Sequence, residues 1–326
     1  MSDFHNTSIL ITGGAGTFGS EMARQLLEKN PQRVIIFSRN EQAQVMMREK
    51  FKDDRLKFII GDIRDARAIR EACEGVNYVF HFSALKHVVI CENQPREAIL
   101  TNVTGSQNVI DACIQNNVDV CVNISSDKSC YATCFYGKTK AIAEGLFTEA
   151  NNITTHTDFF TFRSGNLFGS SGSVVPIWIN QIKQRNYICV TGEKMRRFFI
   201  TPEDAVKAIF KAMDISDRGE IFVPKMDCFY ISDLAKVLVE KYGNEKTEIK
   251  SIPPFPYERI NEWLLTPEES KRCVNHKNFY IIYPLIDIKT TNYPLEKFRM
   301  KNGLTMNDAP ESCVDKLKKL VEKAGY

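Results

Sequence analysis

The sequence predicts an α/β fold, in which a doubly wound parallel sheet is joined to a smaller C-terminal region. Short apolar runs alternate with helical patterns over the first 165 residues, and a glycine-rich turn follows the first run. Runs that are apolar on both faces are typical of parallel strands covered by helices on both sides. Right-handed crossovers between such strands produce a doubly wound sheet.

The alternating elements can be placed in order along the chain. Five runs rich in β-branched residues are the expected strands, and they cover 8–12, 33–37, 56–60, 78–82 and 118–124. Helical periodicity is expected over 22–27, 41–51 and 97–115. The alternation weakens after about residue 166, and we therefore assign residues 1–165 to the sheet domain, with a returning segment near 198–230. Residues 166–197 and 231–326 form the predicted substrate-binding region.

Composition excludes several classes of protein. The 326 residues are 43% hydrophobic and 25% charged, as expected for a globular chain. No apolar run approaches the roughly 18–20 residues of a membrane helix, and residues 1–8 lack the features of a secretory signal. Ten cysteines without a C-x-x-C pair indicate buried, reduced thiols. We expect a cytoplasmic protein that does not bind membranes.

Charge argues against a nucleic-acid partner. The net charge is +3, from 43 basic and 40 acidic residues spread along the chain. Neither a basic stripe nor a zinc-finger spacing occurs. We expect no nucleic-acid partner and no metal site.

The turn after the first expected strand has the spacing G-x-x-G-x-x-G. Glycine permits a tight turn and the close approach of a pyrophosphate, whose charge then meets the N-terminus of the following helix. This context favours dinucleotide binding over a plain structural turn. The expected cofactor contacts here are Gly13, Ala15, Gly16, Thr17, Phe18 and Gly19.

The end of the second expected strand favours NADP over NAD. It contains Ser38, Arg39 and Asn40, and no carboxylate occurs before Glu41. A hydroxyl and a guanidinium suit a 2′-phosphate, whereas NAD enzymes usually place an acidic residue here. Arg39 could instead be an ordinary loop arginine facing solvent. After the third strand, an adenine contact or a simple turn is expected at Asp62 and Ile63.

A serine, a tyrosine and a lysine follow the fifth expected strand. Tyr136 and Lys140 are spaced i, i+4, which places them on one helix face. A lysine ammonium, assisted by an oxidised nicotinamide, lowers a tyrosine pKa from its ordinary value of about 10. The tyrosinate can then accept a hydroxyl proton while hydride leaves the same carbon, with Ser126 holding the substrate oxygen. The alternative is a surface tyrosine beside an exposed lysine.

At these residues the chain resembles the extended short-chain dehydrogenase/reductase superfamily, whose cofactor domain is a Rossmann fold. More closely, it resembles the UDP-N-acetylglucosamine 4,6-dehydratases. The matching stretches are 12–19, 38–41, 83–88, 101–105, 126–128, 136–140, 169–176 and 195–202.

The resemblance implies a lyase that removes water across C5 and C6 of a 4-keto sugar. Asp127 would be the acid and Lys128 the base, although the two could instead form a structural salt bridge. Lys128 must be neutral to act, so we expect burial and nearby positive charge to depress its pKa. Tyr136, where the retaining branch carries methionine, implies inversion at C5. NADP would be recycled in each turnover and held tightly.

The resemblance also implies a UDP-sugar substrate and a homo-oligomer. Further cofactor contacts would be Phe82, Lys86, Tyr136 and Lys140. Substrate contacts would be Lys86, Asn166, Val174, Thr191, Arg197 and Glu258.

Two segments depart from the family pattern. The loop 129–135 lacks the usual Asn or Pro, and segment 253–262 lacks an arginine that helps to hold the nucleotide. Two other functions stay open. A nucleotide-sugar 4-epimerase would need no acid–base pair, and a non-catalytic NADP-sensing regulator would commonly have lost the tyrosine or the lysine.

Overall fold

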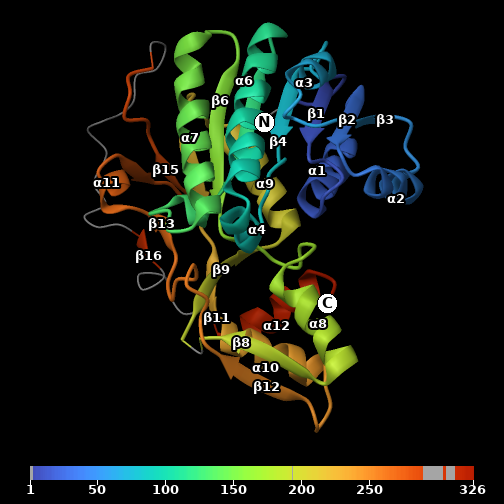
Figure 1. Cartoon of the computed structure of the whole chain (residues 1–326). Helices are drawn as coiled ribbons and strands as arrows, with labels where there is room; N and C mark the ends of the chain where they lie inside the picture. Colours follow the sequence, from blue (N-terminus) through green and yellow to red (C-terminus); the bar gives the residue numbers. More distant parts are fainter. Residues whose placement is uncertain (1–2, 193, 289–303, 306–312) are drawn as a thin grey trace.

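A nine-stranded sheet forms the centre of the computed structural model, which describes residues 3–192, 194–288, 304–305 and 313–326 (Figure 1). Its strand order is β14–β15–β10–β6–β5–β4–β1–β2–β3. Every pairing from β3 to β10 is parallel, whereas β10–β15 and β15–β14 are antiparallel. The predicted doubly wound α/β fold is confirmed.

All five expected strands are present. Their bounds are Ser8–Thr12 (β1), Arg33–Ser38 (β2), Leu56–Ile60 (β3), Tyr78–His81 (β4) and Val120–Ser126 (β5). The remaining strands of this sheet are Asp158–Ser164 (β6), Ile221–Pro224 (β10), Cys273–Asn275 (β14) and Phe279–Ile282 (β15). The central strands bury both faces, which explains their continuous apolar character.

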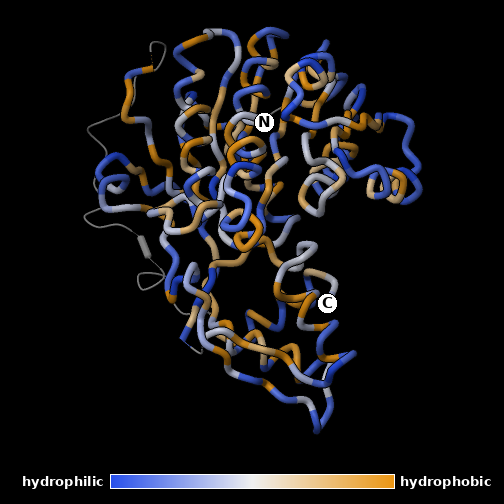
Figure 2. The backbone as a smooth tube through the Cα atoms, viewed as in Figure 1, coloured by the Kyte–Doolittle hydropathy of each residue, from blue (hydrophilic) through white to orange (hydrophobic). Residues whose placement is uncertain are grey.

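Helices cover both faces of the sheet. One face carries Thr17–Leu27 (α1) and Pro202–Met213 (α9), which contact each other. The other carries Ala66–Ala72 (α3), Gly105–Gln115 (α6) and Phe135–Ile153 (α7). Helix α2 (Glu41–Phe51) packs near the β3 edge. Apolar and polar residues alternate along these helices (Figure 2), and apolar residues of α1, α9, α3, α6 and α7 are buried in the clusters that also contain the strands.

The helix expected over 97–115 is interrupted. Pro95–Ile99 (α5) leads into a π-helical turn, Leu100–Thr104 (η1), before α6 begins. Within this turn, Asn102 accepts a hydrogen bond from Leu85 N (2.7 Å) and donates one to Thr139 Oγ1 (3.0 Å). Both partners of Asn102 lie outside this helix. The π-helical turn thus occurs where one side chain bridges two other segments of the chain. A short helix, Val88–Asn93 (α4), precedes it.

A second, smaller body lies below the carboxyl ends of the parallel strands (Figure 1). Its apolar core joins the helices Val174–Arg185 (α8), Ile231–Tyr242 (α10) and Val314–Lys323 (α12) with the strands Tyr187–Thr191 (β8) and Asp227–Tyr230 (β11). Strand β8 pairs with Glu248–Ile252 (β12). Strand Arg196–Ile200 (β9) lies between β11 and Asn166–Leu167 (β7).

Two later segments return to the large sheet. The expected segment near 198–230 contains α9 and β10, whereas β14 and β15 were placed by sequence in the substrate-binding region. Nearby, Trp263–Leu265 (β13) pairs with Leu304–Thr305 (β16), and Pro267–Ser270 (α11) follows β13. Residues 289–303 and 306–312 of that predicted region lie outside the described part. The domain boundaries stay a prediction.

Two sequence expectations about burial can be compared with the structure. Eight of the ten cysteines are buried, and all ten are free thiols. No helix among the described residues is long and apolar enough to cross a membrane.

Candidate active site

A cavity of about 750 Å³ opens at the carboxyl ends of β1 to β6. Doubly wound sheets bind their ligands at this edge. Every residue predicted to contact the cofactor lines the cavity, namely Gly13, Ala15, Gly16, Thr17, Phe18, Gly19, Ser38, Arg39, Asn40, Asp62, Ile63, Phe82, Lys86, Tyr136 and Lys140.

The glycine turn presents the N-terminus of α1 to this cavity. Gly16 is the N-cap residue and provides no side-chain cap for the first backbone N–H groups. At Gly19, an added Cβ would lie 2.5 Å from Gly14 Cα and 2.8 Å from Gly13 O. Only glycine therefore allows the helix to begin this close to the turn, where its N–H groups can bind an anion.

Arginine side chains surround the end of β2. Arg39 Nη1 lies 3.5 Å from Asp62 Oδ2, but Arg64 binds the same oxygen at 2.6 Å. The carboxylate of Asp62 is thus neutralised mainly by Arg64. The Arg39 side chain is 53% exposed and lines the cavity beside Ser38.

Asp127 and Lys128 lie on a short turn between β5 and α7. Asp127–Ser129 forms a 3₁₀ turn (η2), in which Asp127 Oδ1 accepts hydrogen bonds from Ser126 Oγ (2.9 Å) and Lys128 Nζ (3.3 Å). Gly137 makes this arrangement possible, because a Cβ there would lie 2.0 Å from Lys128 O. Helix α7 can thereby bring Tyr136 against the turn.

The prediction that the pKa of Lys128 is depressed is wrong for the chain without ligands. Burial does lower it, but the charges of Asp127 and Glu262 outweigh burial and raise the pKa of Lys128 above its ordinary value. Glu262 Oε1 lies 3.8 Å from Lys128 Nζ. The neighbouring positive charge, Arg197, is too weak to reverse this result. Lys128 is therefore an ammonium before substrate binds.

Burial also shifts the pKa values of Tyr136 and Lys140. Burial raises the pKa of Tyr136 to about 12, although Lys128 and the Ser126 hydroxyl oppose it. Burial lowers the pKa of Lys140 to about 8, against the charge of Glu144. The expected lowering of the tyrosine pKa by Lys140 is thus not a property of the chain alone, because desolvation of the phenolate dominates.

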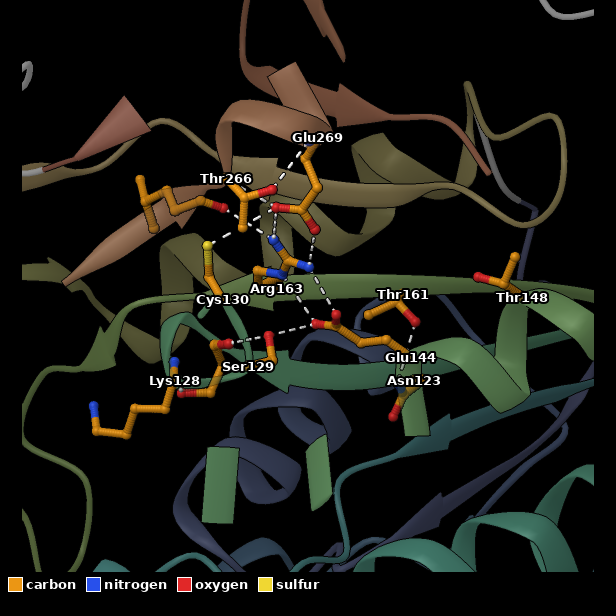
Figure 3. Close-up of polar contacts among 12 residues, drawn as sticks. Asn123, Lys128, Ser129, Cys130, Glu144, Thr148, Thr161, Arg163, Thr266 and Glu269 are labelled. Atoms are coloured by element: carbon orange, nitrogen blue, oxygen red, sulfur yellow. Dashed lines mark hydrogen bonds and ion pairs between the residues drawn. The ribbon is translucent and has the colours of Figure 1, made fainter. Parts of the chain in front are cut away.

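A buried ion network lies against the η2 turn (Figure 3). The Arg163 guanidinium donates to the carboxylates of Glu144 and Glu269, with Nη2 at 2.7 Å from each. Ser129 Oγ, at the end of η2, lies 2.7 Å from Glu144 Oε1. Arg163 Nη1 also donates to Leu264 O at 3.0 Å. The network joins β6, α7 and the C-terminal segment beneath Lys128.

The predicted substrate residues divide into two groups. Lys86 and Asn166 line the cavity, and burial lowers the pKa of Lys86. The other four are absent from its lining. Val174 begins α8, Thr191 Oγ1 lies 3.3 Å from Glu258 Oε1, and Arg197 Nη1 donates to Ile260 O at 3.2 Å.

Sequence reasoning missed two features of the site. Glu262 lies at the end of segment 253–262, and the sequence indicates no role for it beside Lys128. The loop after β7 also lines the cavity, and Ser171 Oγ lies 3.0 Å from Thr17 Oγ1 while Ser171 O accepts from Lys86 Nζ at 3.0 Å. The serines and glycines of 169–173 were the available signal for this loop.

Comparison with known proteins decides the family. The model of a family described as "Polysaccharide biosynthesis protein" matches residues 9–284. The chain belongs to this family. The resemblance to UDP-N-acetylglucosamine 4,6-dehydratases is confirmed by a relative from Campylobacter jejuni with the name "UDP-N-acetylglucosamine 4,6-dehydratase (inverting)". It is 38% identical over 287 residues, which cover 87% of this chain and 84% of the relative.

Other proteins similar to this chain have different names. A relative from Rickettsia rickettsii named "UDP-glucose 4-epimerase" is 38% identical over 285 residues, covering 86% of this chain and 83% of its own. A solved structure, Pen from Bacillus thuringiensis, is 35% identical with a TM-score of 0.92, and the match covers 99% of this chain and 98% of that one. Family membership therefore leaves dehydration and epimerisation to be separated by the site.

Proposed function

We propose that this chain is an NADP-dependent UDP-N-acetylglucosamine 4,6-dehydratase that inverts C5. Its product would be a UDP-4-keto-6-deoxy-N-acetylhexosamine. The observation that carries the proposal is the Asp127–Lys128 pair placed beside Tyr136, because dehydration needs an acid and a base in addition to the oxidising residues. The name of the Campylobacter relative supports the same assignment.

The residues around the cavity fit the cofactor. The uncapped N-terminus of α1 would hold the pyrophosphate, and Arg39 with Ser38 would hold the 2′-phosphate. Tyr136 and Lys140 line the same cavity, where the nicotinamide and the sugar would meet. When bound, NADP⁺ accepts the C4 hydride of the sugar and later returns it to C6, so the overall reaction is a dehydration.

Tyr136 and Ser126 would act on the C4 hydroxyl. The Ser126 hydroxyl holds the sugar oxygen, and the tyrosine oxygen accepts the hydroxyl proton. Since burial holds the pKa of Tyr136 at about 12, ionisation of the phenol depends on the positive charges beside it. In the chain itself that charge comes from Lys128.

Asp127 and Lys128 would divide the elimination between them. Transfer of one proton from Lys128 Nζ to Asp127, across 3.3 Å, creates a neutral amine and a carboxylic acid. The amine then takes the C5 proton, and the acid protonates the C6 hydroxyl, which leaves as water. The pair ends as ammonium and carboxylate, its resting state. Hydride return to C6 leaves an enolate that takes one proton at C5, and this uptake balances the proton that Tyr136 removed from the C4 hydroxyl.

A 4-epimerase is the second candidate, supported by the name of the Rickettsia relative. It would use Tyr136, Lys140 and the same cofactor, but it would give no task to Asp127 and Lys128. The buried carboxylate of Asp127, only 1% exposed and hydrogen-bonded to Ser126 and Lys128, therefore favours dehydration.

Lys128→Ala tests the assignment. We expect the variant to keep its cofactor and to show reduced-cofactor absorbance when UDP-N-acetylglucosamine is added, but to form no 6-deoxy product, because the base is missing. Lys138→Ala, which removes an exposed lysine of α7, is the matched control and should retain full turnover. Robust 6-deoxy product from Lys128→Ala would contradict the proposal.

A further inference from the structure

Lys128 faces a second carboxylate that comes from a distant part of the chain. Glu262 is only 4% exposed, and its Oε1 lies 3.8 Å from Lys128 Nζ. Asp127 Oδ1 lies 3.3 Å from the same nitrogen and belongs to a side chain that is 1% exposed. One ammonium therefore lies within ion-pair distance of two buried carboxylates.

The segment that carries Glu262 is held on both sides of this residue by contacts with the residues that follow the η2 turn and with Arg163. Before it, Arg259 Nη1 donates to Cys130 O at 3.1 Å. After it, the Trp263 ring packs edge-on against Tyr131 with centroids 5.2 Å apart, and Leu264 O accepts from Arg163. These contacts fix the backbone of Glu262 relative to residues 130–131, directly after Lys128.

We propose that Glu262 is a positioning residue that holds the Lys128 side chain and stabilises its ammonium form. This role deepens the proposed function, and its catalytic part rests on that function. During elimination Asp127 is consumed as the acid, so it cannot remain a constant counter-charge. Glu262 takes no part in these proton transfers and stabilises the ammonium that forms when Lys128 takes the C5 proton.

The other groups that face Lys128 are consistent with this role. Tyr136 of α7 favours the ammonium, whereas Arg197 of β9 and burial favour the neutral amine. The charge of Lys128 also acts to lower the pKa of the Cys134 thiol, at the start of α7. Among the groups that favour the ammonium form of Lys128, Asp127 and Glu262 have the two largest effects. Loss of Glu262 should therefore release it more readily.

The charge of Lys128 can be measured without turnover. Only the neutral amine reacts with acetic anhydride, so trace acetylation at pH 9, quantified by peptide mass spectrometry against exposed Lys138, reports the neutral fraction. We expect Glu262→Gln to raise the Lys128 acetylation rate about tenfold, equivalent to a shift of about one pH unit. Glu268→Gln is the matched control, since Glu268 is exposed and contacts Tyr131 instead. It should leave the rate unchanged.

A second variant separates charge from altered packing. Glu262→Asp keeps the carboxylate but loosens the contact, so its acetylation rate should stay within about threefold of the parent. An unchanged rate in Glu262→Gln, or equal increases in both variants, would overturn the proposal. In turnover assays, Glu262→Gln should move the acidic limb of the kcat profile to lower pH. If the dehydratase assignment fails, only the kcat profile loses its meaning. The acetylation measurement still tests the role of Glu262, because it does not depend on the reaction.

Discussion

Arg163→Met should be one of the most destabilising single substitutions in this protein. The side chain is only 1% exposed, and its guanidinium makes four hydrogen bonds to the carboxylates of Glu144 and Glu269, at 2.7 to 3.0 Å. Methionine has a similar length but no charge, so two buried carboxylates lose their shared cation. Breaking a buried ion pair in this way costs about 3–5 kcal/mol in the free energy of unfolding.

Urea unfolding, followed by both tryptophan fluorescence and circular dichroism, measures this cost. Arg24→Met is the matched control, because Arg24 also binds two glutamates, Glu21 and Glu28, but its side chain is 43% exposed. Surface pairs contribute about 0–1 kcal/mol. A cost for Arg163→Met no larger than that of Arg24→Met would refute the reasoning.

The pH dependence provides a second check on the same variant. Burial raises the pKa of Glu269 and Arg163 lowers it, and the result lies below the ordinary value. A depressed carboxyl pKa contributes stability above the unfolded-state pKa and loses it as the pH falls. Without Arg163, only the Thr266 backbone hydrogen bond and the charge of Arg272 oppose burial, so the pKa of Glu269 rises and its carboxyl accepts a proton more readily. The difference between parent and variant should therefore shrink from pH 8 to pH 5, and a constant difference would contradict the account.

Three further predictions concern the cofactor site and acid stability. Arg39→Ala should weaken NADP binding roughly ten- to hundredfold, because it removes a charged hydrogen bond that contributes about 1.5–3 kcal/mol, and should leave NAD binding nearly unchanged. Equal losses in titrations with both cofactors would argue against the 2′-phosphate contact. Gly19→Ala should sharply reduce cofactor content, measured after denaturation, because its Cβ would meet backbone atoms at 2.5 Å, whereas Gly145→Ala in α7 meets nothing within 4 Å and should bind normally. Burial lowers the pKa of His81 to about 3, so stability should fall by about 1.4 kcal/mol per pH unit below pH 6.5, where the unfolded chain takes up a proton. His81→Gln should reduce that slope, and an unchanged slope would exclude His81 as its source.

Local pattern was enough to locate the strands and the cofactor residues. The five expected strands differ from the observed ones by at most two residues at an end, because each is rich in apolar, β-branched or aromatic residues and the central ones are buried on both faces. The glycine turn and the β2 end line the cavity because parallel strands place their carboxyl ends at one edge of the sheet. These properties depend on near neighbours in the sequence.

The charge state of Lys128 could not be predicted in this way. It depends on Glu262 as well as on Asp127, and Glu262 is brought near Lys128 by the contacts of Arg259, Trp263 and Leu264 with other segments. Arg163 itself follows the buried phenylalanines of β6, and nothing near it in the sequence indicates its partners Glu144 and Glu269. The π-helical turn around Asn102 likewise coincides with hydrogen bonds to distant groups.

Proton NMR of the purified protein with UDP-N-acetylglucosamine in deuterated water, without added cofactor, tests the central claim most directly. The account predicts a new C6 methyl signal and deuterium at C5, with ring couplings that report inversion. It predicts turnover without added NADP because the cofactor is regenerated on the enzyme. Formation of the C4 epimer without a methyl signal would contradict dehydration and establish the epimerase instead.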